Sequence, residues 1–222
     1  VTGVQTCALP IYSLITEPYD IVWDCCCDHG FLGMALLERG IAKHINFVDI
    51  IPTLMEALEQ SLQQFEQGKS LPSWQVRCED VAQIKLPTAA KQVVVIAGVG
   101  GDLCLKLIEQ IIANNPQSLH QLSFIICPIQ HLYKVRAGLK ACNLKLENEQ
   151  IIVENKRFYE VLHVSVNASQ TLTQTGAQMW DKHNPQHHQY QQQLLNHYTR
   201  MLNKDRLYYQ KVITEYQRVF EC

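Results

Sequence analysis

Acidic side chains stand at the ends of three apolar runs, and the first of these runs opens into an unusual turn. The stretch "IVWDCCCDHGFLG", residues 21–33, places three consecutive cysteines between Asp24 and Asp28. Asp49 ends the next apolar run, and Asp80 follows a third. Carboxylates at neighbouring strand ends accept hydrogen bonds from ribose hydroxyls and amino groups, and they repel a pyrophosphate. This group of residues predicts a site for a cationic nucleoside such as S-adenosylmethionine.

The adjacent cysteines also raise the question of a metal or redox centre. A structural zinc site needs ligands in two spaced pairs, whereas Cys25, Cys26 and Cys27 are neighbours whose side chains alternate in direction on an extended chain. Most of the other cysteines of this chain lie in apolar runs. We therefore expect reduced thiols that serve as small packing residues, as in a cytoplasmic protein, and we expect no metal site.

The first eleven residues, "VTGVQTCALPI", look like the in-frame translation of a sequencing-library adapter. We expect residues 1–11 to be foreign to the protein, native sequence to begin near Tyr12, and an upstream element to be missing. The stretch lacks the basic start of a secretory signal, and no apolar run of the chain reaches the length of a membrane span.

The composition is that of a globular protein, with 222 residues, 47% hydrophobic residues and a net charge of -2. This charge gives no general attraction to nucleic acid, so any such binding must come from a local patch. From residue 177 onward the chain carries six Lys/Arg against four Asp/Glu, so the preceding part is acidic and the tail is mildly basic.

The elements that must position the carboxylates alternate between β-branched runs and helical patterns. Strands are expected at residues 20–24, 45–49, 74–78, 92–98, 122–128, 144–154 and 157–166. Helices are expected at residues 31–40, 52–68, 102–114 and 132–142. This order predicts an α/β fold, a doubly wound parallel sheet whose last two strands form an antiparallel edge hairpin. Ligands of such sheets bind at the carboxyl ends of the strands, where the three predicted carboxylates stand.

Four stretches together resemble the bacterial tRNA (adenine-22-N1)-methyltransferase family. They are "DCCCDHGFLG", "IAGVGG", the "CP" pair followed by Arg136, and "EQIIVENKRFYEVL". The resemblance implies a class I methyltransferase, Rossmann-like fold with a C-terminal helical extension. It implies S-adenosyl-L-methionine as cofactor and tRNA as partner. The implied division is a cofactor-binding domain at residues 12–168 and an extension at residues 176–222.

The resemblance also implies roles for single residues. Asp49 would hold the ribose, Asp80 the adenine, and Gly98–Gly101 would form the floor of the reaction centre. Cys26 departs from the family motif, which has glycine there, and a cysteine disfavours positive φ. The residues expected to bind the cofactor are Asp24, Cys26, Asp28, Gly30, Asp49, Ile50, Asp80 and Gly98.

Methylation of adenine N1 uses a neutral ring lone pair, so positioning matters more than a general base. The product base is cationic, and Asp28 or Asp102 would stabilise its developing charge, although either could instead cap a helix. His29 would orient Asp28 or contact the base. The residues expected at the reaction centre are Asp28, His29, Gly100 and Asp102.

Two alternatives stay open. "VVVIAGVGGDL" has the strand, Gly-x-Gly turn and helix of an NAD-dependent oxidoreductase, but Leu103 occupies the place of the third glycine. The strand that follows, "LSFIICP", also ends without an acidic residue for a ribose. The second alternative is a module that binds S-adenosylmethionine or RNA without turnover.

The tail combines an apolar stripe with basic residues. The stripe consists of Leu195, Tyr198, Leu202, Tyr209, Val212, Tyr216 and Val219, in steps of three and four, with Asp205 as the one polar member. It predicts a coiled-coil-like helix or a helical hairpin that packs on its own domain or on a second copy, giving a homodimer. The residues expected to bind tRNA phosphates are Arg200, Lys204, Arg206 and Lys211.

Overall fold

The computed structural model describes residue 11, residues 14–15 and residues 18–221. The predicted adapter stretch lies outside these residues except for Ile11, whose side chain is buried against one face of the sheet. The origin of that stretch therefore stays a prediction. No helix in the described residues is both long and apolar enough to span a membrane.

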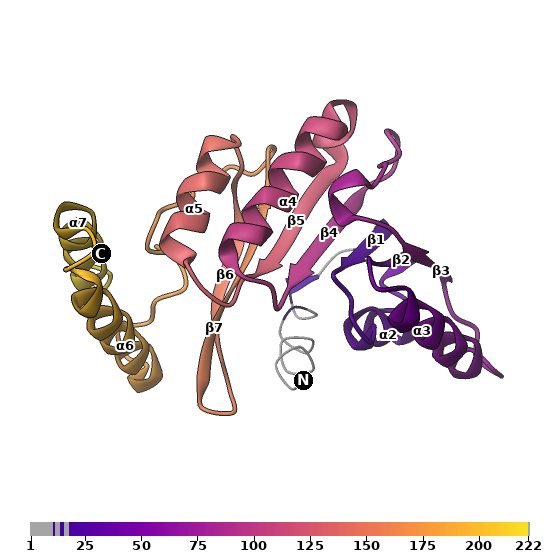
Figure 1. Ribbon diagram of the computed structural model, residues 1–222, viewed down its shortest axis with the longest axis horizontal. Helices are drawn as coiled ribbons and strands as arrows, with labels where there is room; N and C mark the ends of the chain where they lie inside the picture. The colour runs from indigo at the N-terminus through magenta and orange to yellow at the C-terminus, as the bar shows by residue number, and fades with distance from the viewer. Residues whose placement is uncertain (1–10, 12–13, 16–17, 222) are drawn as a thin grey trace.

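A single seven-stranded sheet forms the centre of the molecule, in the order β3-β2-β1-β4-β5-β7-β6 (Figure 1). The strands are β1 (Tyr19–Cys25), β2 (Ala42–Asp49), β3 (Ser73–Cys78), β4 (Gln92–Ala97), β5 (Leu122–Cys127), β6 (Lys145–Glu154) and β7 (Arg157–Ser165). The first five pair in parallel, and β7 pairs antiparallel with both β5 and β6. The predicted parallel sheet with an antiparallel edge hairpin is confirmed.

Helices cover both faces of the sheet. They are α2 (Phe31–Arg39), α3 (Pro52–Phe65), α4 (Gly101–Asn114) and α5 (Leu132–Ala141). The buried side chains of α2 and α3 belong to one apolar cluster, and those of α4 and α5 belong to the cluster on the opposite face. The central strand β4, "QVVVIA", is buried along its whole length because both of its faces meet helices.

The strand order fixes where a ligand can bind. From β1 the chain moves to β2 and β3 on one side, and it then returns to β4 and β5 on the other. The crossover helices therefore leave β1 and β4 in opposite directions. In open α/β sheets, ligands bind at such a divergence, in the crevice beyond the carboxyl ends of the two strands.

The tail folds into a helical hairpin of α6 (Pro185–Met201) and α7 (Arg206–Gln217), beside α5 and β7 at the left of Figure 1. All seven apolar stripe residues join the cluster between these helices and Tyr133 of α5. Asp205, the polar exception, accepts a hydrogen bond from the Tyr208 backbone N–H and caps the start of α7. The stripe is therefore a packing surface for the protein's own body, divided by a turn.

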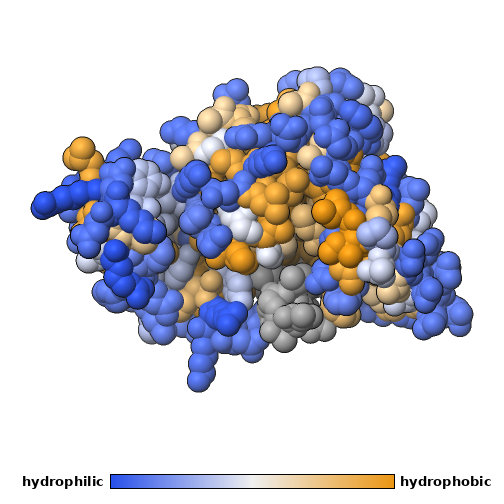
Figure 2. All heavy atoms as spheres, viewed as in Figure 1, coloured by the Kyte–Doolittle hydropathy of each residue, from blue (hydrophilic) through white to orange (hydrophobic). Residues whose placement is uncertain are grey.

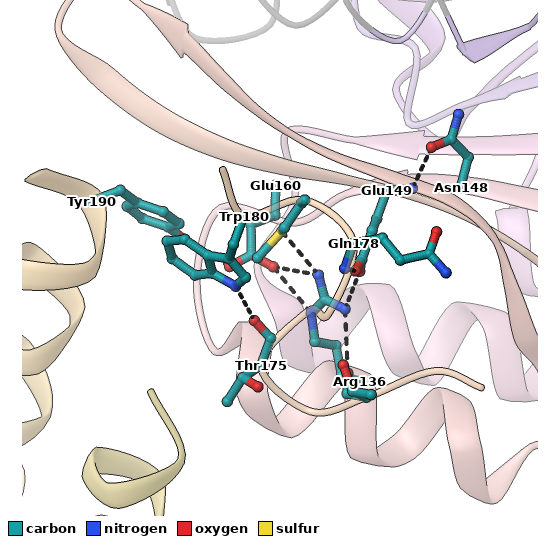
Figure 3. Close-up of polar contacts among 10 residues, drawn as sticks. Arg136, Asn148, Glu149, Glu160, Thr175, Gln178, Trp180 and Tyr190 are labelled. Atoms are coloured by element: carbon teal, nitrogen blue, oxygen red, sulfur yellow. Dashed lines mark hydrogen bonds and ion pairs between the residues drawn. The ribbon is translucent and has the colours of Figure 1, made fainter. Parts of the chain in front are cut away.

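A buried ionic cluster connects the hairpin to the sheet (Figure 3). Arg136 of α5 is fully buried and donates hydrogen bonds to Glu149 of β6 at 2.6 Å and Glu160 of β7 at 2.7 Å. Its guanidinium also donates to the Thr173 carbonyl, and Tyr190 of α6 donates its hydroxyl to Glu160 at 2.9 Å. One arginine therefore connects α5, the edge hairpin, the linker and the tail.

The linker between β7 and α6 closes over this cluster. The Gln178 backbone N–H donates to Glu149, and the Trp180 indole donates to the Thr175 carbonyl. Gly176 has a φ of 77°, and a Cβ there would stand 3.0 Å from the Arg136 guanidinium. The turn therefore needs glycine both for its backbone conformation and for the space beside Arg136.

Candidate cofactor and substrate site

Three aspartates converge at the crevice between β1 and β4. Asp24 lies near the end of β1, Asp49 ends β2, and Asp80 follows β3. Burial raises the pKa of the Cys26 thiol to about 12, and the negative charges of all three aspartates add to this increase. Their shared effect on one thiol indicates that the carboxylates surround the turn after β1, as the sequence predicts.

Asp24 is the innermost of the three carboxylates, with 4% of its surface exposed. Its Oδ2 accepts a hydrogen bond from the Gly33 backbone N–H at 2.9 Å, which ties the end of β1 to the first turn of α2. Burial raises the pKa of Asp24 to about 7, opposed by the hydrogen bond from Gly33 and assisted by the charge of Asp49. A Cβ on Gly33 would lie 2.2 Å from the Phe47 ring and 2.9 Å from Asp24 Oδ2, so only glycine fits.

The turn after β1 is built from left-handed residues. Cys26 has a φ of 56°, Asp28 a φ of 51° and Gly30 a φ of 67°. Cys26 therefore adopts a left-handed backbone conformation, which glycine, the residue of the family motif at this position, adopts at lower cost. Its side chain packs against the cluster that contains Val99 and Cys104. The three cysteines are free thiols, which fits the predicted packing role.

Asp49 is fixed by backbone donors on both sides. Its Oδ2 accepts from the Asp28 N–H at 3.2 Å, and its Oδ1 accepts from the Ile50 N–H at 2.7 Å. The carboxylate therefore joins the turn after β1 to the end of β2. Asp80 accepts from the Ala82 N–H at 2.9 Å and caps the short 3-10 helix η1 (Val81–Gln83). This cap uses one oxygen, Oδ1, of an exposed carboxylate.

The glycine loop after β4 is pressed against the segment that follows β5. Gly98 has a φ of 77°, and its N–H donates to the Cys127 carbonyl at 3.1 Å. Gly100 precedes α4 as its capping residue. A Cβ on Gly101 would lie 2.3 Å from the Gln130 carbonyl oxygen, so this close contact requires glycine.

The predicted catalytic carboxylates have different surroundings. His29 Nε2 lies 3.6 Å from Asp28 Oδ1, and both side chains are exposed to solvent beside the cofactor turn. Asp102 is paired with Lys134 at 2.7 Å and with His131 at 3.3 Å. Lys134, followed by His131, lowers the pKa of Asp102. The Lys134 ammonium therefore offsets part of the charge that Asp102 was expected to offer a methylated base.

Exposed apolar residues border the crevice. Among the described residues, the large apolar side chains with the greatest exposure near the strand ends are Phe31, Ile50, Ile51, Leu103 and Ile129. Each follows the carboxyl end of β1, β2, β4 or β5 within a few residues, and Figure 2 shows apolar surface between the α4 region and the α2–α3 region. Ile50, which is 65% exposed, was predicted from the sequence to bind the cofactor, but the other four residues were not predicted as site residues. Apolar residues directly after a strand end are the signal that would have found them.

The residues present fit S-adenosylmethionine. Asp49 stands at the end of β2 with the exposed Ile50 beside it, which suits a ribose and the face of a purine. The pKa of the buried Asp24 is raised to about 7, and a bound sulfonium cation would favour its ionised form, because an opposite charge nearby lowers the pKa of a carboxyl group. In the described part of the chain, no group of three or more His, Cys, Asp or Glu side chains could hold a metal ion.

The turn between α6 and α7 brings the predicted RNA-binding residues towards the same edge of the sheet. The ring of Tyr208 contacts that of Tyr133 at 5.9 Å, and Lys134, the next residue of α5, binds Asp102. Leu207 is 88% exposed at the start of α7. The predicted RNA-binding side chains around this turn, all exposed, are Arg200, Lys204, Arg206 and Lys211.

Comparisons with known proteins relate the chain to methyltransferases. A family model described as "Methyltransferase domain" matches residues 9–162. Streptococcus pneumoniae Sp1610, a candidate tRNA (m1A22) methyltransferase solved with S-adenosyl-L-methionine, superposes with a TM-score of 0.74 at 19% identity. That match covers 96% of this chain and 97% of the other. A search of curated proteins gave no match.

Two further solved structures show how the tail distinguishes the neighbours. The Bacillus subtilis m1A22 tRNA methyltransferase TrmK matches with a TM-score of 0.69 at 17% identity, covering 100% of this chain and 96% of that one. The magnesium protoporphyrin IX methyltransferase of Synechocystis PCC 6803, with bound SAM, matches with a TM-score of 0.56 at 16% identity. It covers 71% of this chain and 78% of the other. These similarities show the fold.

Proposed function

The chain belongs to the methyltransferase domain family, and from this premise we propose that it transfers the methyl group of S-adenosylmethionine to N1 of an adenine in tRNA. The observation that carries the proposal is the extent of the structural match. The tRNA methyltransferase of B. subtilis matches the whole chain, including the helical hairpin, whereas the porphyrin methyltransferase covers 71% of it. The expected target is adenine 22, the position for which the S. pneumoniae and B. subtilis m1A22 methyltransferases are named.

The strand-end carboxylates support the cofactor assignment. Asp49 holds the ribose hydroxyls, Asp80 accepts from the adenine amino group, and Asp24 lies beside the sulfonium. Bound at this edge, S-adenosylmethionine supplies an electrophilic methyl group. Adenine N1 gives its lone pair to the methyl carbon, the carbon–sulfur bond breaks with its electrons remaining on sulfur, and the base becomes a cation. The protein therefore needs to bind, orient and desolvate the two reactants, and no general base is required.

The substrate assignment depends on the tail. We assign residues 12–168 to the cofactor-binding domain and residues 176–222 to an extension that holds tRNA beside it. The four basic residues around the α6–α7 turn are exposed, and Tyr208 of this turn region contacts Tyr133, whose neighbour Lys134 binds Asp102 at the start of α4. The activity is expected in the cytoplasm, where unmodified tRNA is available. Pairing of two copies through the hairpin is the competing use of this surface.

Mapping of modified nucleosides tests the proposal. Purified protein and unmodified tRNA are incubated with labelled S-adenosylmethionine, and the digested RNA is analysed for 1-methyladenosine. We expect label in 1-methyladenosine at one position, and no label when NADH replaces the methyl donor. Binding of S-adenosylmethionine without any methylated RNA would instead favour a module without turnover, the alternative that Cys26 leaves open.

A further inference from the structure

The segment between β5 and α5 is held rigidly over the glycine loop. The Ile129 N–H donates to the Val99 carbonyl at 3.0 Å, and His131 Nδ1 lies 3.3 Å from Asp102 Oδ2. Between these two anchors, the Gln130 carbonyl lies so close to Gly101 that a Cβ there would stand 2.3 Å away. The backbone at Gln130 is thereby fixed against the start of α4.

The Gln130 side chain lies over the neighbouring glycine. Its Nε2 would stand 3.1 Å from a Cβ placed on Gly100, and the residue is exposed. Gly100 belongs to the loop that the family resemblance assigns to the floor of the reaction centre. The amide therefore lies beside the place where a target base is expected to receive a methyl group.

An enzyme that methylates N1 has to recognise adenine without covering N1. The Watson–Crick edge offers the reacting atom itself, so a hydrogen bond to it would block the lone pair. The Hoogsteen edge offers the N6 amino group as donor and N7 as acceptor, and a glutamine amide matches both with one oxygen and one nitrogen. A carboxylate lacks the donor and an ammonium group lacks the acceptor.

We infer that Gln130 selects the target base by accepting from adenine N6 with its Oε1 and donating from its Nε2 to N7. This inference rests on the proposed function and names the residue that reads the base. Leu103 and Ile129, which is 56% exposed, provide apolar contacts for the purine near the amide. Both side chains are exposed where a base would cover them.

The contact also strengthens during the reaction. As N1 donates its lone pair, positive charge spreads onto the N6 amino group, which becomes a better hydrogen-bond donor. The hydrogen bond to Oε1 is therefore stronger in the transition state than in the bound substrate. Removal of the amide is expected to lower kcat more than it raises the KM for tRNA.

The test combines a protein change with a single-atom change in the RNA. The RNA carries adenosine or 7-deazaadenosine at the target position, and 7-deazaadenosine has a C–H group in place of the N7 acceptor. Because this change also makes N1 more basic, each variant is compared by its ratio of rates on the two RNAs. With the wild-type protein we expect about a 5- to 100-fold lower kcat/KM for the 7-deaza RNA, the discrimination that one bidentate amide pair supplies. The Gln130→Ala variant is expected to be slow on both RNAs and to distinguish them by less than about twofold.

A second variant separates base reading from poor folding. Gln130→Glu keeps an acceptor for N6 but places a lone pair against N7, so it should prefer the 7-deaza RNA over adenosine. A folding defect cannot reverse a substrate preference. Gln121→Ala, an exposed glutamine directly before the amino end of β5, serves as the control and should behave as the wild type on both RNAs.

Other outcomes overturn the inference. A full 7-deaza penalty in Gln130→Ala, or wild-type rates in that variant, would show that another group reads the base. Both results require an active wild-type enzyme, so they leave the proposed function intact. A wild-type protein that binds S-adenosylmethionine but places no methyl group on any adenine N1 overturns the proposed function and this inference together.

Discussion

At the scale of single residues, Asp49 gives the clearest test of the cofactor site. The backbone N–H groups of Asp28 and Ile50 hold its carboxylate at the end of β2. We expect Asp49→Ala to weaken the binding of S-adenosylmethionine by about 1.5 to 3 kcal/mol, the scale of hydrogen bonds to a charged group. Calorimetric titration measures this loss. Asp49→Asn keeps an acceptor for Ile50 and controls for disorder of the turn, and equal affinity in wild type and Asp49→Ala would remove the ribose assignment.

Asp24 predicts a dependence of stability on pH. Its pKa is raised from 3.8 to about 7 in the folded protein, mainly by burial, so the folded state keeps a proton that the unfolded chain releases. The stabilisation by this proton is complete below 3.8 and is lost as the pH rises towards about 7. Asp24→Asn, which still accepts from Gly33, should therefore gain stability over wild type with rising pH.

The size of this gain is bounded by the pKa difference. At pH 8 it should reach at most about 4 kcal/mol, and it should vanish near pH 4. Urea unfolding of both proteins across this range measures it. Glu56→Gln, which removes an exposed carboxylate on α3, serves as the control. Parallel stability curves for wild type and Asp24→Asn would show that Asp24 is ionised in the folded protein.

The sequence was informative about these residues because residue type and strand position are both visible in it. Asp24, Asp49 and Asp80 each follow an apolar run, and parallel pairing brings such ends together. Gln130 and Lys134 could not be found in this way. Their importance depends on contacts between the segment after β5 and the start of α4, and only the packed structure shows those contacts.

At the scale of elements, Arg136 determines how the tail docks on the body. It is fully buried between Glu149 and Glu160, and removal of one partner from a buried ion pair leaves an uncompensated charge. We expect Arg136→Met to lower the free energy of unfolding by about 3 to 5 kcal/mol. Lys140→Met, on the exposed face of the same helix, should change it by less than about 0.5 kcal/mol.

Urea unfolding followed by tryptophan fluorescence is suited to this measurement because Trp180 packs against Tyr190 of α6 beside the cluster. A wild-type midpoint in Arg136→Met would show that apolar packing alone holds the tail. The sequence marked Arg136 only as part of a family motif. Its hydrogen-bond partners come from β6, β7 and the linker, and Tyr190 of α6 joins the cluster through Glu160. No periodicity in the chain connects these residues.

The tail shows a related limit of sequence patterns. The seven apolar stripe residues were correctly identified as a packing surface, since steps of three and four define one helix face. The same spacing left a single helix and a hairpin both open. Asp205 decides between them because its carboxylate caps α7. The sequence alone does not distinguish a capping aspartate from a polar residue within a continuous heptad pattern.

At the scale of the whole molecule, charge and apolar surface are divided between the two parts. The body before residue 177 is acidic, and its strand-end carboxylates suit a cationic cofactor better than a polyanion. A base within folded RNA must be unpaired or flipped before its N1 can meet a methyl group, so the RNA must be held while this happens. The acidic body cannot supply that hold by general attraction.

The α6–α7 turn can supply the attraction that holds the RNA. Its basic residues are exposed, and the exposed Leu207 and Tyr208 lie within the same turn region. The ring of Tyr208 contacts that of Tyr133, the residue before Lys134. We expect that changing Arg200, Lys204, Arg206 and Lys211 to glutamine weakens tRNA binding and leaves the affinity for S-adenosylmethionine unchanged. Phosphate contacts release counterions, whereas contacts in the cofactor crevice do not.

The salt dependence makes this prediction quantitative. Each lost phosphate contact should reduce the slope of log K against log salt concentration by about 0.7 to 0.9, so four contacts reduce it by about 3. Changing Lys182 and Arg218, which are exposed basic residues outside the α6–α7 turn, to glutamine gives the control and should leave the slope nearly unchanged. Filter binding at several salt concentrations measures both. If the fourfold variant bound tRNA with the wild-type affinity and slope, the hairpin would be a packing or dimerisation element, and the RNA would have to be held by Lys134 and its neighbours on the body.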